Sequence, residues 1–188
     1  MGILMERIEI EGEAEERVSM ILKELAELPL EEMLGYALKG EEDAIGLYTM
    51  LAEKIEEPHA KMRFRQFIKS EKGHREKILR IFGELFPERQ IPEVAAPTWA
   101  NEVKHEIKTV GDYLEVLEVA IRSEKLAEKM YASMAGSFSS ERYRDIFTSL
   151  AEDERRHYAF LISQYRFYRR AKVEENLHGI IESLIRKE

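Results

Sequence analysis

An internal repeat constrains the fold of this 188-residue chain more than any other feature of its sequence. The pattern Glu-x-x-Ala-x-x-x-Tyr begins at Glu41 and again at Glu124, and the pattern Glu-x-x-His begins at Glu71 and again at Glu154. Both patterns recur at the same offset of 83 residues (124 − 41 and 154 − 71). One offset shared by two patterns predicts that a single supersecondary unit occurs twice in the chain.

The repeated unit is predicted to be a hairpin of two long helices. Apolar residues recur at helical spacing through both copies, and Pro or Gly residues interrupt the pattern between the helices. Asp112 is the expected N-cap of the third helix and Gly136 its expected end, while Ser139 or Ser140 caps the fourth. The four expected helices cover residues 30–57, 58–86, 112–135 and 139–170.

The chain is expected to form one bundle domain flanked by two helical extensions. Residues 30–170 form the bundle, and a proline-containing crossover at 87–111 joins the two hairpins. Residues 1–29 are expected to hold a short amphipathic helix, and residues 171–188 a C-terminal helix. The apolar faces of these extensions predict contacts in a homo-oligomer, unless they cap the ends of the bundle instead.

Helical geometry places the repeated polar residues at one depth in the bundle. Glu71 and His74 lie three positions apart and therefore share a helix face. Glu41 and His74 are equally distant from the turn at Glu57 and Pro58, so they face each other when the hairpin closes. Each lies about 20–25 Å from that turn, because a helix rises about 1.5 Å per residue.

The second hairpin repeats this arrangement, and packing the hairpins about a pseudo-two-fold axis would gather four carboxylates and two imidazoles. Bare carboxylates cannot stay buried, whereas two divalent cations would nearly neutralise four of them. The chain has no Cys, which excludes thiolate sites and leaves ligands that suit iron or manganese, with zinc as a further candidate. The expected ligands are Glu41, Glu71, His74, Glu124, Glu154 and His157.

At this point the sequence resembles the rubrerythrin branch of the ferritin-like superfamily. The resemblance covers about residues 30–170 and is carried by two motifs. Gly40-Glu41-x-x-Ala44-x-x-x-Tyr48 is similar to the first-helix motif of that family, and Asp153-Glu154-Arg155-Arg156-His157 is similar to a motif of the wider di-iron carboxylate group. The resemblance implies an all-α, ferritin-like four-helix bundle in which the six residues above are the ligands of two metal ions, most often iron.

Four further residues are expected around the ligands. By the resemblance, Asp153 orients the imidazole of His74, although a solvated Asp153 is the competing interpretation. Ser70 occupies the repeat-related position, so weaker support is expected for the other imidazole, that of His157. Tyr48 and Tyr131 either bond to ligand carboxylates, relay electrons or are ordinary core tyrosines.

The chain departs from rubrerythrins in two respects. An additional Glu ligand of that family corresponds here to Ala127, with Glu128 one position further round the helix. Rubrerythrins also end in a Cys-rich rubredoxin module, and a chain without Cys needs a separate electron donor, such as a rubredoxin. A basic face on residues 58–86, which includes Lys69 and Lys72, is either solvated or a docking surface for such an acidic donor.

The predicted function is that of a non-haem di-iron oxidoreductase, a peroxidase or oxidase that reduces hydrogen peroxide or dioxygen. The alternatives are ferroxidase activity with iron storage, a metal-binding protein without turnover, and an oxygenase acting on an organic substrate. A formal net charge of −8 argues against nucleic acid as a partner. No apolar run approaches the roughly 18 residues that span a bilayer, so a cytoplasmic protein is expected.

Overall fold

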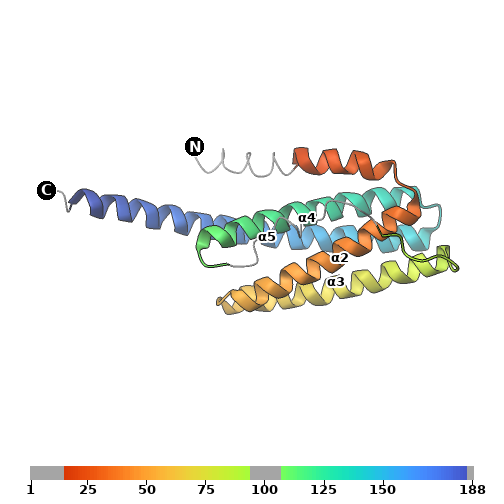
Figure 1. Ribbon diagram of the computed structural model, residues 1–188, viewed down its shortest axis with the longest axis horizontal. Helices are drawn as coiled ribbons and strands as arrows, with labels where there is room; N and C mark the ends of the chain where they lie inside the picture. The colour runs from red at the N-terminus through yellow and green to blue at the C-terminus, as the bar shows by residue number, and fades with distance from the viewer. Residues whose placement is uncertain (1–14, 94–106, 186–188) are drawn as a thin grey trace.

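The structure, a computed structural model, describes residues 15–93 and 107–185. Four long helices dominate it, and the expected all-helical fold is confirmed (Figure 1). A shorter helix over residues 15–26 precedes them, and most of the predicted crossover falls on residues 94–106, outside the described ones. The long helices are α2 (Leu30–Lys54), α3 (Pro58–Leu85), α4 (Val110–Ser137) and α5 (Glu141–Ile185).

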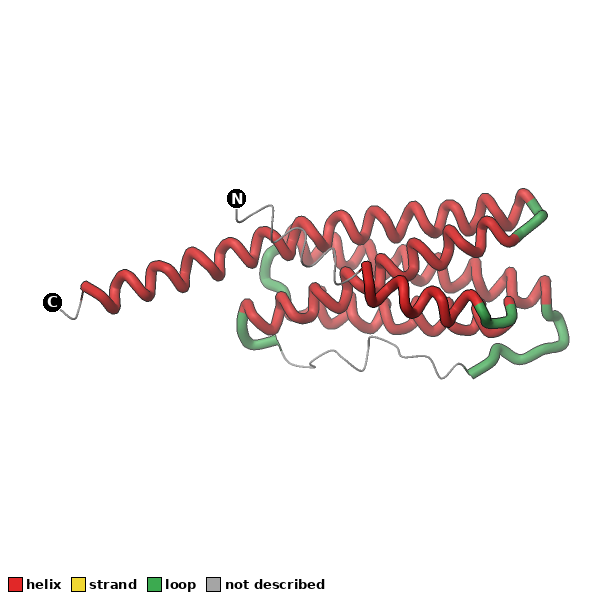
Figure 2. Tube along the Cα trace, turned by 90° about the horizontal axis from the view of Figure 1, so that it is seen from above, coloured by secondary structure: helices red, strands yellow, loops and turns green. Residues whose placement is uncertain are grey.

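The helices pack as two antiparallel hairpins, α2 with α3 and α4 with α5. Between the hairpins, α2 lies beside α4 and α3 lies beside α5 (Figures 1 and 2). Each hairpin is closely packed internally, whereas the contacts between hairpins are fewer. This arrangement leaves the middle of the bundle as the place where side chains from all four helices meet.

Two hydrophobic clusters fill the two ends of the bundle. One contains Leu34, Ile78 and Phe147, and the other contains Phe64 and Leu117, all of them fully buried. Each of the four helices therefore runs from one apolar cluster, through a buried polar stretch, into the other cluster. The apolar ends supply the burial that stabilises the fold.

Two helix boundaries differ from those predicted, because local hydrogen bonds set them. The predicted extension of α2 to residue 57 is wrong, since the Glu57 carboxylate caps α3 and accepts from the backbone N–H groups of His59 and Ala60. Asp112 is not the N-cap of α4. The N-cap is Thr109, and Asp112 is the third helical residue of a capping box with it.

Two of the predicted helix ends are absent from the structure. α4 continues through Gly136 to Ser137. α5 shows no break near residue 170 and runs as one helix to Ile185, so it projects beyond the bundle (Figure 1). Neither Pro nor Gly occurs from residue 141 to residue 178, so the backbone has no residue that would end the helix there.

The N-terminal helix over residues 15–26 lies along the flank of the bundle beside α4 (Figure 1). Its Val18 and Leu25 are buried in one hydrophobic cluster, and Glu15 forms an ion pair with Lys129 of α4. This extension therefore covers the side of the bundle. Among the described residues, no helix is long and apolar enough to cross a membrane.

Candidate metal centre

The six predicted ligand side chains lie together in the middle of the bundle, and all are at most 5% exposed. α2 and α4 each contribute one glutamate, whereas α3 and α5 each contribute a glutamate and a histidine three residues later. Residues at equal distances from the hairpin turns therefore lie at one depth in the bundle, as their spacing in the sequence predicts. The six are Glu41, Glu71, His74, Glu124, Glu154 and His157.

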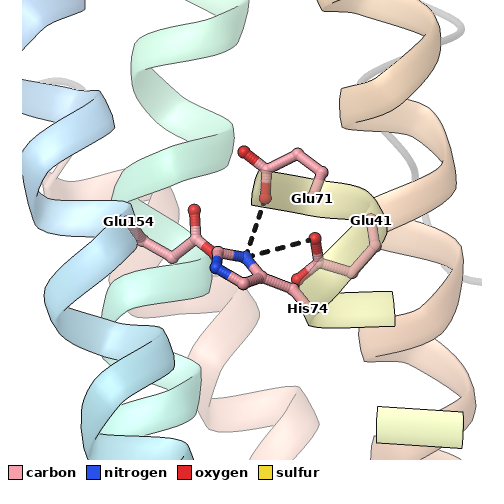
Figure 3. Close-up of side chains that lie close together, drawn as sticks. All are labelled: Glu41, Glu71, His74 and Glu154. Carbon is pink, nitrogen blue, oxygen red and sulfur yellow. Dashed lines mark ion pairs between the residues drawn. The ribbon is translucent and has the colours of Figure 1, made fainter. Parts of the chain in front are cut away.

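The imidazole of His74 faces three carboxylates (Figure 3). Its Nδ1 atom lies 2.9 Å from Oε2 of Glu71, 2.9 Å from Oε1 of Glu154 and 3.6 Å from Oε2 of Glu41. One nitrogen cannot hydrogen-bond three carboxylates in good geometry at once. A cation among these atoms would be attracted to every one of them.

The imidazole of His157 has an equivalent environment. Its Nδ1 atom lies 2.7 Å from Oε1 of Glu71, 3.3 Å from Oε2 of Glu154 and 3.5 Å from Oε2 of Glu124. Glu71 and Glu154 therefore contact both imidazoles, whereas Glu124 contacts only this one of the pair. The six residues form two overlapping groups that share two carboxylates.

The donor atoms of each group fit a metal ion. Within each group, one donor atom from every residue lies within 4.8 Å of the others. Each of the six residues also has a buried nitrogen or oxygen atom without a hydrogen-bond partner, a costly state that a bound cation relieves. Glu71 and Glu154 would bridge two ions, with Glu41 and His74 completing one ligand set and Glu124 and His157 the other.

Asp153 contacts His74, as the resemblance implied. Its Oδ2 atom lies 3.2 Å from Nε2 of His74, and the Oγ atom of Ser70 lies 3.3 Å from the same nitrogen. Arg156 binds the other oxygen of Asp153. Burial raises the pKa of Asp153, but the bonds to His74 and Arg156 outweigh burial and leave this pKa below its usual value. An ionised Asp153 therefore fixes the His74 ring with Nδ1 toward the cluster.

His157 is held by packing where His74 is held by hydrogen bonds. The ring of Phe67 lies 4.0 Å from the His157 ring, centroid to centroid, and no described side chain bonds to Nε2 of His157. The residues that correspond through the repeat to Asp153 and Leu150 are Ser70 and Phe67. Phe67 is not among the residues predicted for the site. The repeat does show that Phe stands at position 67 where the second copy has Leu150. The two ligand sets are therefore unequal in their surroundings.

Two tyrosines link the hairpins at the cluster. Tyr48 donates a hydrogen bond to Glu124, and Tyr131 donates one to Glu41, so each tyrosine bonds to the other hairpin's glutamate. Burial, and then the adjacent carboxylate, raise the pKa of both tyrosines well above the usual value. Both hydroxyls therefore keep their protons and hold these two carboxylates in place.

Glu128, the remaining predicted residue of the site, points away from the cluster. Its carboxylate accepts a hydrogen bond from Lys125 at 3.0 Å, and its side chain is 19% exposed. A helix turns about 100° per residue, so position 127 lies about 60° to one side of Glu124 and position 128 about 40° to the other, which separates Glu128 from the side on which Ala127 lies. Ala127, which does follow Glu124 on the same face, offers no ligand.

Without a cation, the cluster holds protons near neutral pH. Burial and then the Glu154 carboxylate raise the pKa of Glu41 well above its usual value and that of Glu124 to about 8. Burial lowers the pKa of His74 and His157, but the carboxylates that lie close to each Nδ1 atom outweigh it. The pKa of His157 is thereby raised to about 12, and that of His74 is also strongly raised.

Fold and site together define an all-helical, ferritin-like bundle with buried carboxylate and histidine groups that can hold metal ions. The sequence model of the family described as Rubrerythrin matches residues 32–165 and also residues 115–183, so this chain belongs to the rubrerythrin family. Among solved structures, a hypothetical protein from Pyrococcus furiosus is similar, with 27% identity and a TM-score of 0.69. The match covers 76% of this chain and 92% of that protein. No curated protein matches the chain significantly.

Metal binding is expected to release protons and to tighten as the pH rises from about 6 to 8. Groups with a raised pKa hold their protons at any pH below that pKa, so a cation competes with protons for the carboxylates. The affinity for the cation therefore rises as the pH passes the pKa of Glu124. Calorimetric titration of Mn(II) in buffers of different ionisation enthalpy measures the protons released. Affinity that is independent of pH, with no proton release, would contradict this prediction.

The Asp153→Ala substitution is expected to weaken one of the two metal sites by about 10- to 100-fold and to spare the other. His74 loses its charged partner, whereas His157 has no such partner to lose. Stepwise metal titration measures the two affinities. Asp145→Ala, at an exposed position of the same helix, is the control. Equal weakening of both sites would show that Asp153 does not act through His74.

Proposed function

We propose that this protein is a non-haem di-iron oxidoreductase that reduces hydrogen peroxide or dioxygen with electrons from a separate donor. The observation that carries the proposal is the pair of buried ligand sets that share Glu71 and Glu154. Membership of the rubrerythrin family supports this class of chemistry. Manganese or zinc fits the same donor atoms, so the choice of iron is part of the proposal.

The two ligand sets would hold two iron ions, which when bound would supply one electron each and Lewis acidity, as a two-electron reduction requires. For peroxide the balance is H2O2 + 2 e⁻ + 2 H⁺ → 2 H2O, in which the O–O bond breaks and both oxygen atoms leave as water. Paired delivery avoids the radical that a single electron would produce.

The residues of the chain hold the ligands and shield the site along the bundle axis. Tyr48 and Tyr131 fix the two terminal carboxylates across the hairpin interface, and Asp153 fixes the imidazole of His74. The hydrophobic clusters above and below the site keep water from entering through the ends of the bundle, which strengthens the electrostatic interactions within it. The protein thus supplies a preorganised ligand set, and its buried carboxylates offset the charge of the metal ions.

An acidic electron donor, such as a rubredoxin, is proposed to dock on the basic face of α3. Lys69 and Lys72 are exposed there and alternate along the helix with the cluster residues Glu71 and His74. The path from this surface to the cluster therefore crosses little more than the width of one helix. Electrostatic complementarity would accelerate the encounter of donor and protein.

An anaerobic Fe(II) titration of the metal-free protein is expected to reach two tightly bound irons per chain. The Glu71→Ala/Glu154→Ala variant removes both shared carboxylates and is expected to bind less than one. Glu76→Ala/Glu152→Ala, at exposed positions of the same helices, is the matched control and should bind two. Absence of tight iron from the unaltered protein would overturn the oxidoreductase proposal.

Mixing the iron-loaded protein with peroxide or with dioxygen then separates the candidate activities. Rapid oxidation with two irons still bound, followed by repeated turnover with a reductant, supports the peroxidase or oxidase. Uptake of many irons per chain into a large assembly would indicate ferroxidase activity and storage instead. Tight metal without reaction would leave a metal-binding protein without turnover.

The Lys69→Glu/Lys72→Glu variant is expected to be reduced about 10-fold more slowly by an acidic donor at low salt, with a weaker dependence on ionic strength. Stopped-flow reduction by a rubredoxin measures the rate. Lys23→Glu/Lys54→Glu makes the same change of charge at exposed positions outside α3. Equal rates for the two variants would exclude the basic face of α3 as the docking surface.

A further inference from the structure

A cavity of about 40 Å³ reaches the metal centre from the side of the bundle on which α2 and α4 lie together. The inner part of its wall is formed by four buried carboxylates, those of Glu41, Glu71, Glu124 and Glu154. Its remaining wall comes from α2 and α4 alone. The cavity is partly open, so it connects the donor atoms of both ligand sets with the surface.

Four of the five partly exposed residues that line this cavity are small. They are Gly40 and Ala44 of α2 and Ser123 and Ala127 of α4, and the fifth is Asp43. A Cβ atom added at Gly40 would meet no atom within 4 Å, so the space next to this residue is open. Glycine inside a helix costs roughly 0.5–1 kcal/mol relative to alanine. At this position its effect is to leave the width of the cavity unobstructed.

The opposite side of the centre, between α3 and α5, is filled by side chains. The Phe67 ring stacks on His157 and meets the ring of Phe160 at 5.4 Å, edge to face. The His74 ring is bonded to Asp153 on the same side. A small molecule therefore meets packed rings on the α3 and α5 side and an open, carboxylate-floored cavity on the α2 and α4 side.

The volume and lining of the cavity limit what it can admit. A cavity holds about one water molecule for roughly each 10–15 Å³ of its volume, whereas pockets for organic ligands measure about 300–1,000 Å³. A cavity of about 40 Å³ therefore holds a molecule of about three heavy atoms. No Lys, Arg or His is among the described residues that line it, and the carboxylates disfavour anions.

We propose that this cavity is the passage by which small neutral molecules reach the metal centre, and that Gly40 sets its width. The inference rests on the proposed function and deepens it by assigning the route to the site and the residue that limits the size of what passes. Gly40 is the residue that determines this size limit.

The absence of cysteine from the chain permits a test that requires neither metal nor turnover. The Ser123→Cys substitution places a single thiol in the passage. We expect methyl methanethiosulfonate, a small neutral reagent, to modify it readily, while a maleimide carrying a bulky dye reacts at least about 10-fold more slowly than with an exposed thiol. Equal access for the two reagents would overturn the size limit.

The second substitution narrows the passage. Adding Gly40→Leu to Ser123→Cys is expected to slow modification by the small reagent about 10-fold, because the new side chain fills the open space. Gly46→Leu is the matched control, since Gly46 also lies in α2 with open space at its Cβ but does not line the cavity. If Gly40→Leu does not fold, Gly40→Val should act in the same direction. No slowing in the folded variant would overturn the role of Gly40.

A third measurement follows access to the metals directly. Nitric oxide, a neutral molecule of two atoms, should bind the Fe(II)-loaded Gly40→Leu variant about 10-fold more slowly, at an unchanged iron count. Gly46→Leu should match the unaltered protein. Equal rates in all three would show that small molecules reach the metals by another route. If the thiol is labelled as expected but the protein binds no iron tightly, the passage is supported and the proposed function is overturned.

Discussion

Four carboxylates and two imidazoles buried in the middle of a hydrophobic bundle are the constraint on which the rest of this structure depends. Each helix interrupts its own apolar core at this level, and among the described residues no Lys or Arg is buried in the cluster, so protonated imidazoles are its only positive charges there. Protons can partly relieve the repulsion, as the raised pKa values of Glu41 and Glu124 indicate. Divalent cations relieve it fully, which couples metal binding to the stability of the bundle.

The duplicated hairpin gives the centre an approximate two-fold symmetry. Residues that differ between the two copies of the repeat reduce this symmetry. Glu71 and Glu154 are equivalent, and so are the two crossed tyrosine bonds. The surroundings of the imidazoles differ, since Asp153 bonds to His74 while Phe67 packs on His157. The two ligand sets are therefore expected to differ in their affinity for a metal ion.

The α3 side of the centre also differs from the α2 and α4 side, and this difference would suit a protein electron donor on the first and a small molecule on the second. Imidazole rings, aromatic packing and exposed lysines lie on the side of α3, where we propose that a protein donor docks. Carboxylates and small residues lie on the side of α2 and α4, where a cavity reaches the surface. Separate routes would let reductant and oxidant meet the metals without competing for one surface.

The sequence alone determined the helical hairpin, its duplication and the six residues of the centre. The period and rise of a helix are fixed by backbone geometry, so spacing in the chain translates directly into depth and face within a hairpin. Contacts between hairpins follow no such rule. Only the tertiary structure decided that Tyr48 and Tyr131 bond across the interface, that Ser70 joins Asp153 at His74, and that Gly40 borders a cavity. These features depend on how far apart the two hairpins sit and how each is rotated, which the packing of many distant side chains sets together.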